Sequence, residues 1–80
     1  MNYKERLADI IQELACEFYL SNKEKEIYYY MCQGMTPVTI CKQLNTEVST
    51  VRKQINNLYN KLNINNINEL LSLVIMRGLS

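Results

Sequence analysis

Residues 36–62 read TPVTICKQLNTEVSTVRKQINNLYNKL, and this stretch decides the fold. Thr36 before Pro37 predicts a helix start, because the threonine can cap the helix and proline is tolerated in its first turn. The polar turn Asn45-Thr46-Glu47 ends that short helix. Apolar residues then recur at the spacing of one helix face, namely Val51, Ile55, Leu58 and Leu62. The stretch therefore predicts a helix over 37–44, a tight turn and a longer helix over 48–62.

Helical periodicity continues on the N-terminal side of this stretch. A first helix is expected over 1–18, capped by Asn2. Its apolar face carries Tyr3, Leu7, Ile10, Ile11, Leu14 and Phe18. Ser21 and Glu24 form a capping box, S-x-x-E, so a second helix is expected to begin near Asn22 and to stop at Gly34. In that helix we expect Tyr30 to face inward, with Tyr28 or Tyr29 at least partly exposed.

The same periodicity continues on the C-terminal side. Asn63 suits the left-handed conformation that ends a helix, and Asn65 or Asn66 can cap a last helix over 67–77. Strand-like alternation and internal repeats are both missing from the sequence. We therefore expect an all-α fold, with an N-terminal amphipathic helix over 1–19 and a helix-turn-helix domain over 20–80.

The residue inventory argues against catalysis. The 80 residues include no histidine, and the three cysteines (Cys16, Cys32 and Cys41) lack C-x-x-C spacing. Cysteines without such spacing typically serve as small apolar side chains in proteins of a reducing compartment. Without a phosphate-binding loop or a nucleophile–base pair, we expect no enzyme activity, metal or cofactor. The sequence also has no apolar run of the roughly 18 residues that a membrane span needs and no signal-peptide centre, so a cytoplasmic protein is expected.

The net charge of +1 is unevenly divided along the chain. Residues 1–26 carry four basic and six acidic side chains, a net −2, whereas residues 27–80 carry five basic and two acidic ones, a net +3. This asymmetry favours a polyanionic partner for the second part of the chain. A mixed solvated surface is the alternative.

The helix expected over 48–62 has a polar face opposite its apolar stripe. At about 100° per residue, that face carries Ser49, Lys53, Asn56, Asn57 and Asn60, with Arg52 and Lys61 on its two shoulders. Lysine can read guanine and asparagine can read adenine in the major groove. We therefore predict double-stranded DNA as the partner. Lys53, Asn56 and Asn60 would contact bases, and Arg52, Lys61, Lys42, Thr36 and Ser49 would contact phosphates.

Six short motifs follow one another over residues 20–70. They are L-S-x-K-E-x-E-I at 20–27, G-M-T at 34–36, I-C-x-x-L at 40–44, T-V-R at 50–52, N-L-x-x-K-L at 57–62 and N-x-x-E-L at 66–70. This ordered set resembles the LuxR/GerE-type helix-turn-helix domain, and the chain is similar to stand-alone GerE-like proteins. The resemblance implies a four-helix DNA-binding module whose third helix, 48–62, is the reader.

The resemblance also assigns roles to individual residues. Arg52, Lys53 and Asn56 fall at base- and phosphate-contact positions, while Asn57 and Lys61 would hold the backbone or the scaffold. Thr50 is a further predicted DNA contact. The last helix often forms a homodimer contact in this family, which places Leu70, Leu71, Val74 and Ile75 there. The expected function is a sequence-specific transcription regulator that inserts helix 48–62 into the major groove as a dimer, with half-sites about 34 Å apart.

Several departures from the family pattern keep alternatives open. Thr46-Glu47 replaces the usual I-S before the reading helix, so either Thr46 caps that helix or Val48 takes the core position. Gln54 and Ile67 replace a usual His and Arg. A protein-binding adaptor or anti-regulator with little DNA affinity is one alternative, with helix 1–18 or 67–77 as the partner surface. A promoter-binding module like sigma factor region 4 is another. The apolar stripes of helices 1–18 and 67–77 either contact a second chain or close the domain's own core.

Overall fold

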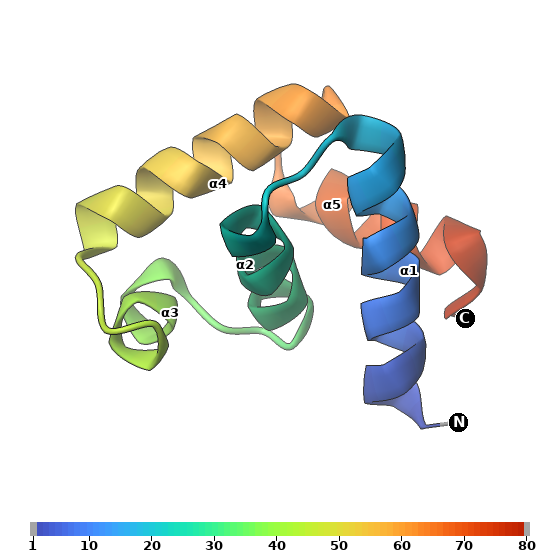
Figure 1. Cartoon of the computed structure of the whole chain (residues 1–80), viewed down its shortest axis with the longest axis horizontal. Coiled ribbons are helices and arrows are strands. Elements are labelled where there is room, and N and C mark those ends of the chain that lie inside the picture. The colour runs from blue at the N-terminus through green and yellow to red at the C-terminus, as the bar shows by residue number, and fades with distance from the viewer. Residues whose placement is uncertain (1, 80) are drawn as a thin grey trace.

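The computed structural model describes residues 2–79 and is all-helical over that range, as predicted. In chain order, the elements are α1 (Tyr3–Phe18), α2 (Asn22–Cys32), α3 (Pro37–Gln43), α4 (Val48–Leu62) and α5 (Ile67–Val74), followed by a π-helical turn, η1 (Ile75–Leu79). Figure 1 shows α2 near the middle, with α3 and α1 on either side and α4 running above α3 and α2. None of these helices is long and apolar enough to cross a membrane.

Most predicted helix boundaries are confirmed by their capping contacts. The side chain of Asn2 accepts a hydrogen bond from the Glu5 N–H at 2.9 Å, and that of Asn66 accepts one from the Glu69 N–H at 3.0 Å. Both contacts of the Ser21–Glu24 capping box form. Asn63 ends α4 in the left-handed region, at φ 56°. These side chains satisfy backbone N–H groups that a helix start leaves without partners.

Of the two remaining predicted helix ends, one is confirmed and one was too long. The second helix ends at Cys32, and Gly34 follows it in the left-handed region at φ 85°, as its place at the helix stop predicts. The α-helical hydrogen bonding of the last helix ends at Val74 instead of residue 77, because the chain widens into the π turn η1. Gly78 lies at φ 111°, and its carbonyl oxygen accepts a hydrogen bond from the Arg6 guanidinium of α1. The last turn is therefore shaped by its packing on α1.

One hydrophobic core is shared by all five α-helices. Helix α2 packs against α1 and α4, and α3 packs against α4. The apolar face of α1 is buried in this core, through Leu7, Ile10, Ile11 and Leu14. Each such side chain stabilises the fold by about 1.5–3 kcal/mol when fully buried. The stripe of the first helix therefore closes the chain's own core, although Tyr3 at its start is 53% exposed.

The three consecutive tyrosines of α2 lie differently from the prediction. Tyr28 is fully buried, whereas Tyr29 and Tyr30 are half-buried. Tyr28 can be buried because its hydroxyl donates a hydrogen bond to the Leu70 carbonyl oxygen at 2.8 Å, which satisfies its polar tip. Burial raises the pKa of Tyr28 above its usual range. The expectation that Tyr30 is the inward-facing tyrosine was wrong, and Tyr28 joins α2 to α5.

The solvent face of α1 carries a row of carboxylates at four-residue spacing. Glu5, Asp9 and Glu13 are all exposed, and none forms an ion pair within residues 2–79. Like charges at this spacing destabilise a helix, and opposite charges stabilise it by about 0.2–0.5 kcal/mol per pair. The row is therefore an unfavourable element of an otherwise stable helix.

Replacing Asp9 by lysine is expected to stabilise the protein by about 1 kcal/mol, because it turns two repulsive pairs into two attractive ones. Urea denaturation at low ionic strength measures the change. Asp9→Asn, which removes only the repulsion, should give roughly half of it. A lysine variant no more stable than the natural protein would show that the row costs the helix nothing.

Candidate nucleic-acid interface

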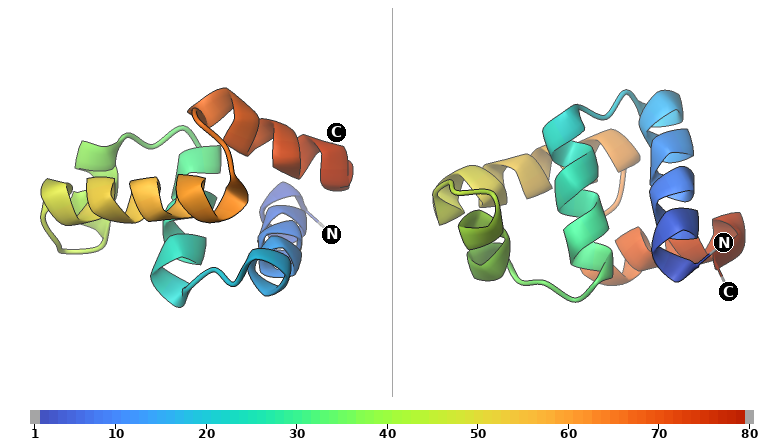
Figure 2. Two further views of the ribbon diagram at one scale, coloured as in Figure 1. Left: turned by 90° about the horizontal axis from the view of Figure 1, so that it is seen from above. Right: turned by 60° about the horizontal axis from the view of Figure 1, so that its bottom comes forward.

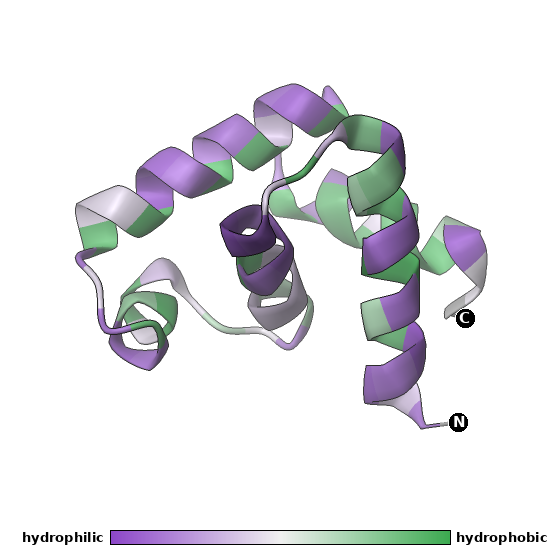
Figure 3. Cartoon of the chain, in the orientation of Figure 1, coloured by the Kyte–Doolittle hydropathy of each residue, from purple (hydrophilic) through white to green (hydrophobic). Residues whose placement is uncertain are grey.

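No other element of residues 2–79 covers the outer face of α4. Seen from above, α4 lies in the foreground across the molecule, with α2 and α3 behind it (Figure 2). Its apolar stripe is turned inward, and Val51, Ile55, Leu58 and Leu62 are all buried. Figure 3 shows the resulting division, with the hydrophilic side of α4 outward and its hydrophobic side toward the core. A helix held in this way can enter the major groove, which is about 12 Å wide.

The predicted contact residues of α4 lie together on this outer face. Seven of them are exposed and have no side-chain hydrogen bond or ion pair to other residues in the range 2–79: Ser49, Thr50, Arg52, Lys53, Asn56, Asn57 and Asn60. No acidic residue occurs within Val48–Leu62. The face thus offers cationic and amide donors to a ligand without giving up a contact inside the protein.

The two predicted contacts outside α4 lie differently. Lys42 lies in the last turn of α3, exposed and without an ion pair in the described chain. Thr36 is engaged as the cap of α3, where its hydroxyl oxygen accepts a hydrogen bond from the Thr39 N–H at 3.3 Å. It also lies 3.1 Å from the Thr39 hydroxyl. Lys42 is therefore the freer of the two groups.

The N-terminus of α4 has no side-chain cap. Glu47 occupies the capping position without making the capping hydrogen bond. Thr46 does not replace it; its N–H donates to the Cys41 carbonyl oxygen at 2.9 Å, within the turn after α3. Val48 is half-buried, with Ser49 exposed after it. The N–H groups in the first turn of α4 are thus free, and such groups bind phosphate readily.

Replacing Glu47 by serine is expected to raise the free energy of unfolding by about 1 kcal/mol, because serine at this position can accept a hydrogen bond from the first turn. Chemical denaturation of the two proteins measures the difference. Glu47→Gln is the matched control, since it removes the charge without supplying a good cap. Equal stability of the serine and glutamine variants would contradict a capping effect.

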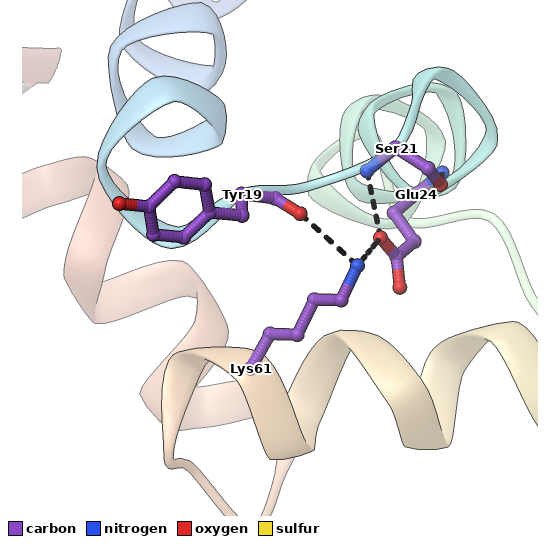
Figure 4. Close-up of polar contacts among 4 residues, drawn as sticks. All are labelled: Tyr19, Ser21, Glu24 and Lys61. Carbon is purple, nitrogen blue, oxygen red and sulfur yellow. Dashed lines mark hydrogen bonds and ion pairs between the residues drawn. The ribbon is translucent and has the colours of Figure 1, made fainter.

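Lys61, at the other end of α4, is held by the scaffold. Its Nζ lies 2.7 Å from Glu24 Oε1 and 3.0 Å from the Tyr19 carbonyl oxygen (Figure 4). The same Glu24 oxygen accepts the Ser21 N–H at 2.7 Å. The Glu24 residue is only 4% exposed. One lysine thereby ties the C-terminal part of α4 to the α1–α2 loop and the start of α2.

The charge state of Glu24 follows from these contacts. Burial alone would raise the pKa of its carboxyl group, but the hydrogen bonds from Lys61 and Ser21 and the positive charge of Lys61 outweigh burial. The pKa consequently lies below its usual value of 4.5. The sequence identified Glu24 only as half of a capping box. It contains no local signal for this ion pair, because the partners lie 37 positions apart.

The four predicted dimer residues differ in how exposed they are to solvent. Leu70 is fully buried and Val74 is 1% exposed within the single chain, so these two predicted dimer contacts are part of the chain's own core. Both face the core because α5 packs on α1 and its backbone receives the hydroxyl of Tyr28. Leu71 is half-buried and Ile75 is 53% exposed. Only Leu71 and Ile75 of the predicted set remain accessible to a partner.

A short helix, a tight turn and a second helix with an exposed cationic and amide-rich face together define a helix-turn-helix DNA-binding domain. The pattern of the bacterial regulatory proteins of the luxR family matches residues 19–74, and the chain belongs to this family. It is accordingly a bacterial DNA-binding transcription regulator and not an enzyme. The match favours the LuxR/GerE interpretation over sigma region 4. Comparisons with curated proteins and with solved structures gave no significant match.

Proposed function

We propose that this protein is a sequence-specific transcription regulator that inserts α4 into the major groove of double-stranded DNA in the bacterial cytoplasm. The observation that carries the proposal is the outer face of α4, where seven polar side chains are exposed and have no partner in the described chain. Buried apolar residues on the opposite side hold the helix rigidly for this use.

The contacts divide by chemistry. Lys53, Asn56 and Asn60 lie on the outer face and can make the paired hydrogen bonds that distinguish bases. Arg52 and Asn57 flank them and, with Lys42, Ser49 and Thr50, are suited to phosphates. The free N–H groups of the first turn of α4 add a neutral phosphate contact. Thr36 acts mainly through its cap of α3, and Lys61 acts through the placement of α4.

A homodimer is the second part of the proposal. Leu71 and Ile75 border a shallow pocket of about 210 Å³ that is also lined by Tyr3, Cys32 and Val74. Tyr3 and Ile75 are each 53% exposed, and Met76 beside them is 83% exposed. Contiguous exposed apolar side chains of this kind favour a protein contact. A second copy on this surface would present two α4 helices to two half-sites about 34 Å apart.

Selection from random duplex DNA, followed by sequencing at two salt concentrations, tests DNA reading. A palindromic motif with steep salt dependence is expected, because phosphate contacts release counterions. Weak binding without enrichment would contradict the proposal and favour a protein-binding adaptor.

Sedimentation equilibrium tests the dimer separately. Ile75→Glu is expected to yield monomers, while Val38→Glu, which charges an exposed valine of α3, should leave the association unchanged. A natural protein that is monomeric in solution and on DNA would contradict this part.

A further inference from the structure

A hollow lies between α1 and α2, which run side by side (Figures 1 and 2). Its volume is about 280 Å³. It is lined by Ala8, Ile11 and Gln12 of α1 and by Lys25, Glu26, Tyr29 and Tyr30 of α2. The two tyrosine rings meet edge to face with centroids 6.0 Å apart. Half-buried tyrosines around an apolar hollow are typical of places where a partner side chain inserts.

The carboxylate row of α1 runs along one side of this hollow, with Glu5 and Asp9 nearest to it. Glu5 is three positions before Ala8, and Asp9 is three positions before Gln12, so each acid neighbours a lining residue on the helix surface. Glu5, Asp9 and Glu13 have no ion-pair partner in residues 2–79. With Lys4 as the one positive charge, the α1 side of the rim is thus net negative.

Three lysines lie near the hollow, and Lys4 of α1, four positions before Ala8, is exposed and has no ion pair in residues 2–79. Lys25 donates a hydrogen bond from Nζ to Gln12 Oε1 at 3.0 Å, across the hollow between the two helices. Lys23 pairs with Glu26 at 3.7 Å on α2. Neither Lys25 nor Lys23 forms an ion pair with the carboxylate row on α1. A partner that completes the charge pattern must therefore bring its own cations.

We propose that the α1–α2 groove and the acidic row beside it dock a basic amphipathic helix of another protein. An apolar side chain of that helix would enter the hollow between Ala8, Ile11 and Tyr29, and its lysines or arginines would face Glu5, Asp9 and Glu13. A second copy fits less well, since its cationic helix, α4, keeps its apolar stripe buried in its own core and has none to insert into the hollow.

The position of the groove makes it independent of the DNA-reading face. None of its lining residues lies on α4, and α1 lies outside the part of the chain that matches the family pattern. Docking there leaves the outer face of α4 free. The protein could then hold DNA and a basic partner at the same time. The proposed docking of that partner does not depend on the proposed binding of DNA.

A synthetic four-turn peptide of leucine and lysine, patterned as an amphipathic helix, is the probe. Its binding to the full chain is followed by fluorescence anisotropy and by ¹⁵N NMR shifts. We expect micromolar binding that weakens with salt, with shifts centred on Ala8, Gln12 and Tyr29. The triple variant Glu5→Gln/Asp9→Asn/Glu13→Gln should bind at least tenfold more weakly. Glu47→Gln, an exposed acid removed from another surface, is the matched control and should bind as the natural protein does.

Results of three kinds would overturn the proposal. The first is equal binding of a leucine–glutamate peptide of the same pattern, which would show that charge plays no part. The second is unchanged affinity of the triple variant, or shifts that lie outside α1 and α2. The third is self-association of the chain through Ala8 and Tyr29, which would make a second copy the occupant. Because all substituted acids are exposed, circular dichroism of the triple variant should confirm that it remains folded.

Discussion

A Lys53→Ala variant is expected to bind its preferred DNA sequence roughly 5- to 150-fold more weakly than the natural protein. This corresponds to about 1–3 kcal/mol for the loss of one base-reading side chain. Lys53 lies opposite the buried stripe of α4, is exposed and makes no ion pair within residues 2–79. Its removal therefore leaves no unpaired group in the protein, and the loss reports on DNA contact alone.

Fluorescence anisotropy at fixed salt, with the selected duplex and its single-base variants, measures this effect. Lys53→Ala should flatten discrimination at one base pair, whereas Lys42→Ala on α3 should weaken all duplexes alike and reduce the salt dependence. Lys4→Ala removes an exposed lysine of α1 and is the matched control. Unchanged affinity of the Lys53 variant for its selected site would remove Lys53 from the base-reading role.

Local chemistry made most of the fold predictable. Capping side chains and left-handed asparagines act within a few residues of their targets, so Asn2, Ser21, Asn63 and Asn66 marked true boundaries. The inward face of α4 followed from its three- and four-residue spacing. The choice among three adjacent tyrosines was different, because the carbonyl that accepts the Tyr28 hydroxyl lies 42 positions away. Such a partner exists only once α5 is packed.

For the candidate interface, too, helix geometry was predictable from the sequence and tertiary contacts were not. The residues exposed on α4 follow from helix geometry, and periodicity alone placed them opposite the core. The neighbours of those residues do not follow from it. Lys61 occupies a shoulder of the same helix but reaches Glu24 and Tyr19 on other elements. The α5 stripe was likewise split by tertiary packing, with Leu70 inside and Ile75 outside.

Replacing Lys61 by methionine is expected to lower the free energy of unfolding by about 2–3 kcal/mol. Removing one partner of a buried pair costs about 3–5 kcal/mol, because the other charge stays buried alone. The Glu24 side chain is 5% exposed, but that of Lys61 is 39% exposed, so solvent reduces the loss. Methionine keeps the aliphatic stem, and chemical denaturation at neutral pH measures the difference.

DNA binding separates this scaffold role from a phosphate contact. If Lys61 acts by holding α4, the methionine variant should bind all duplexes more weakly while its salt dependence stays that of the natural protein. A phosphate contact would instead lower the salt slope by about one. A lowered slope with unchanged stability would place the ammonium group of Lys61 on DNA.

Acid should narrow the stability gap between the natural protein and the Lys61→Met variant. In the natural protein the folded-state pKa of Glu24 lies below 4.5, so the ion pair stabilises the fold above that pH and is lost as the pH falls through the lowered pKa. In the Lys61→Met variant, the buried Glu24 carboxylate has lost its cationic partner, and burial disfavours its charged form. Protonation of Glu24 at low pH therefore removes part of the variant's destabilisation. A double variant with Glu24→Gln should recover part of the neutral-pH loss. If the difference in unfolding free energy stayed constant from pH 7 down to the pH at which the protein unfolds, packing and not the ion pair would anchor the end of α4.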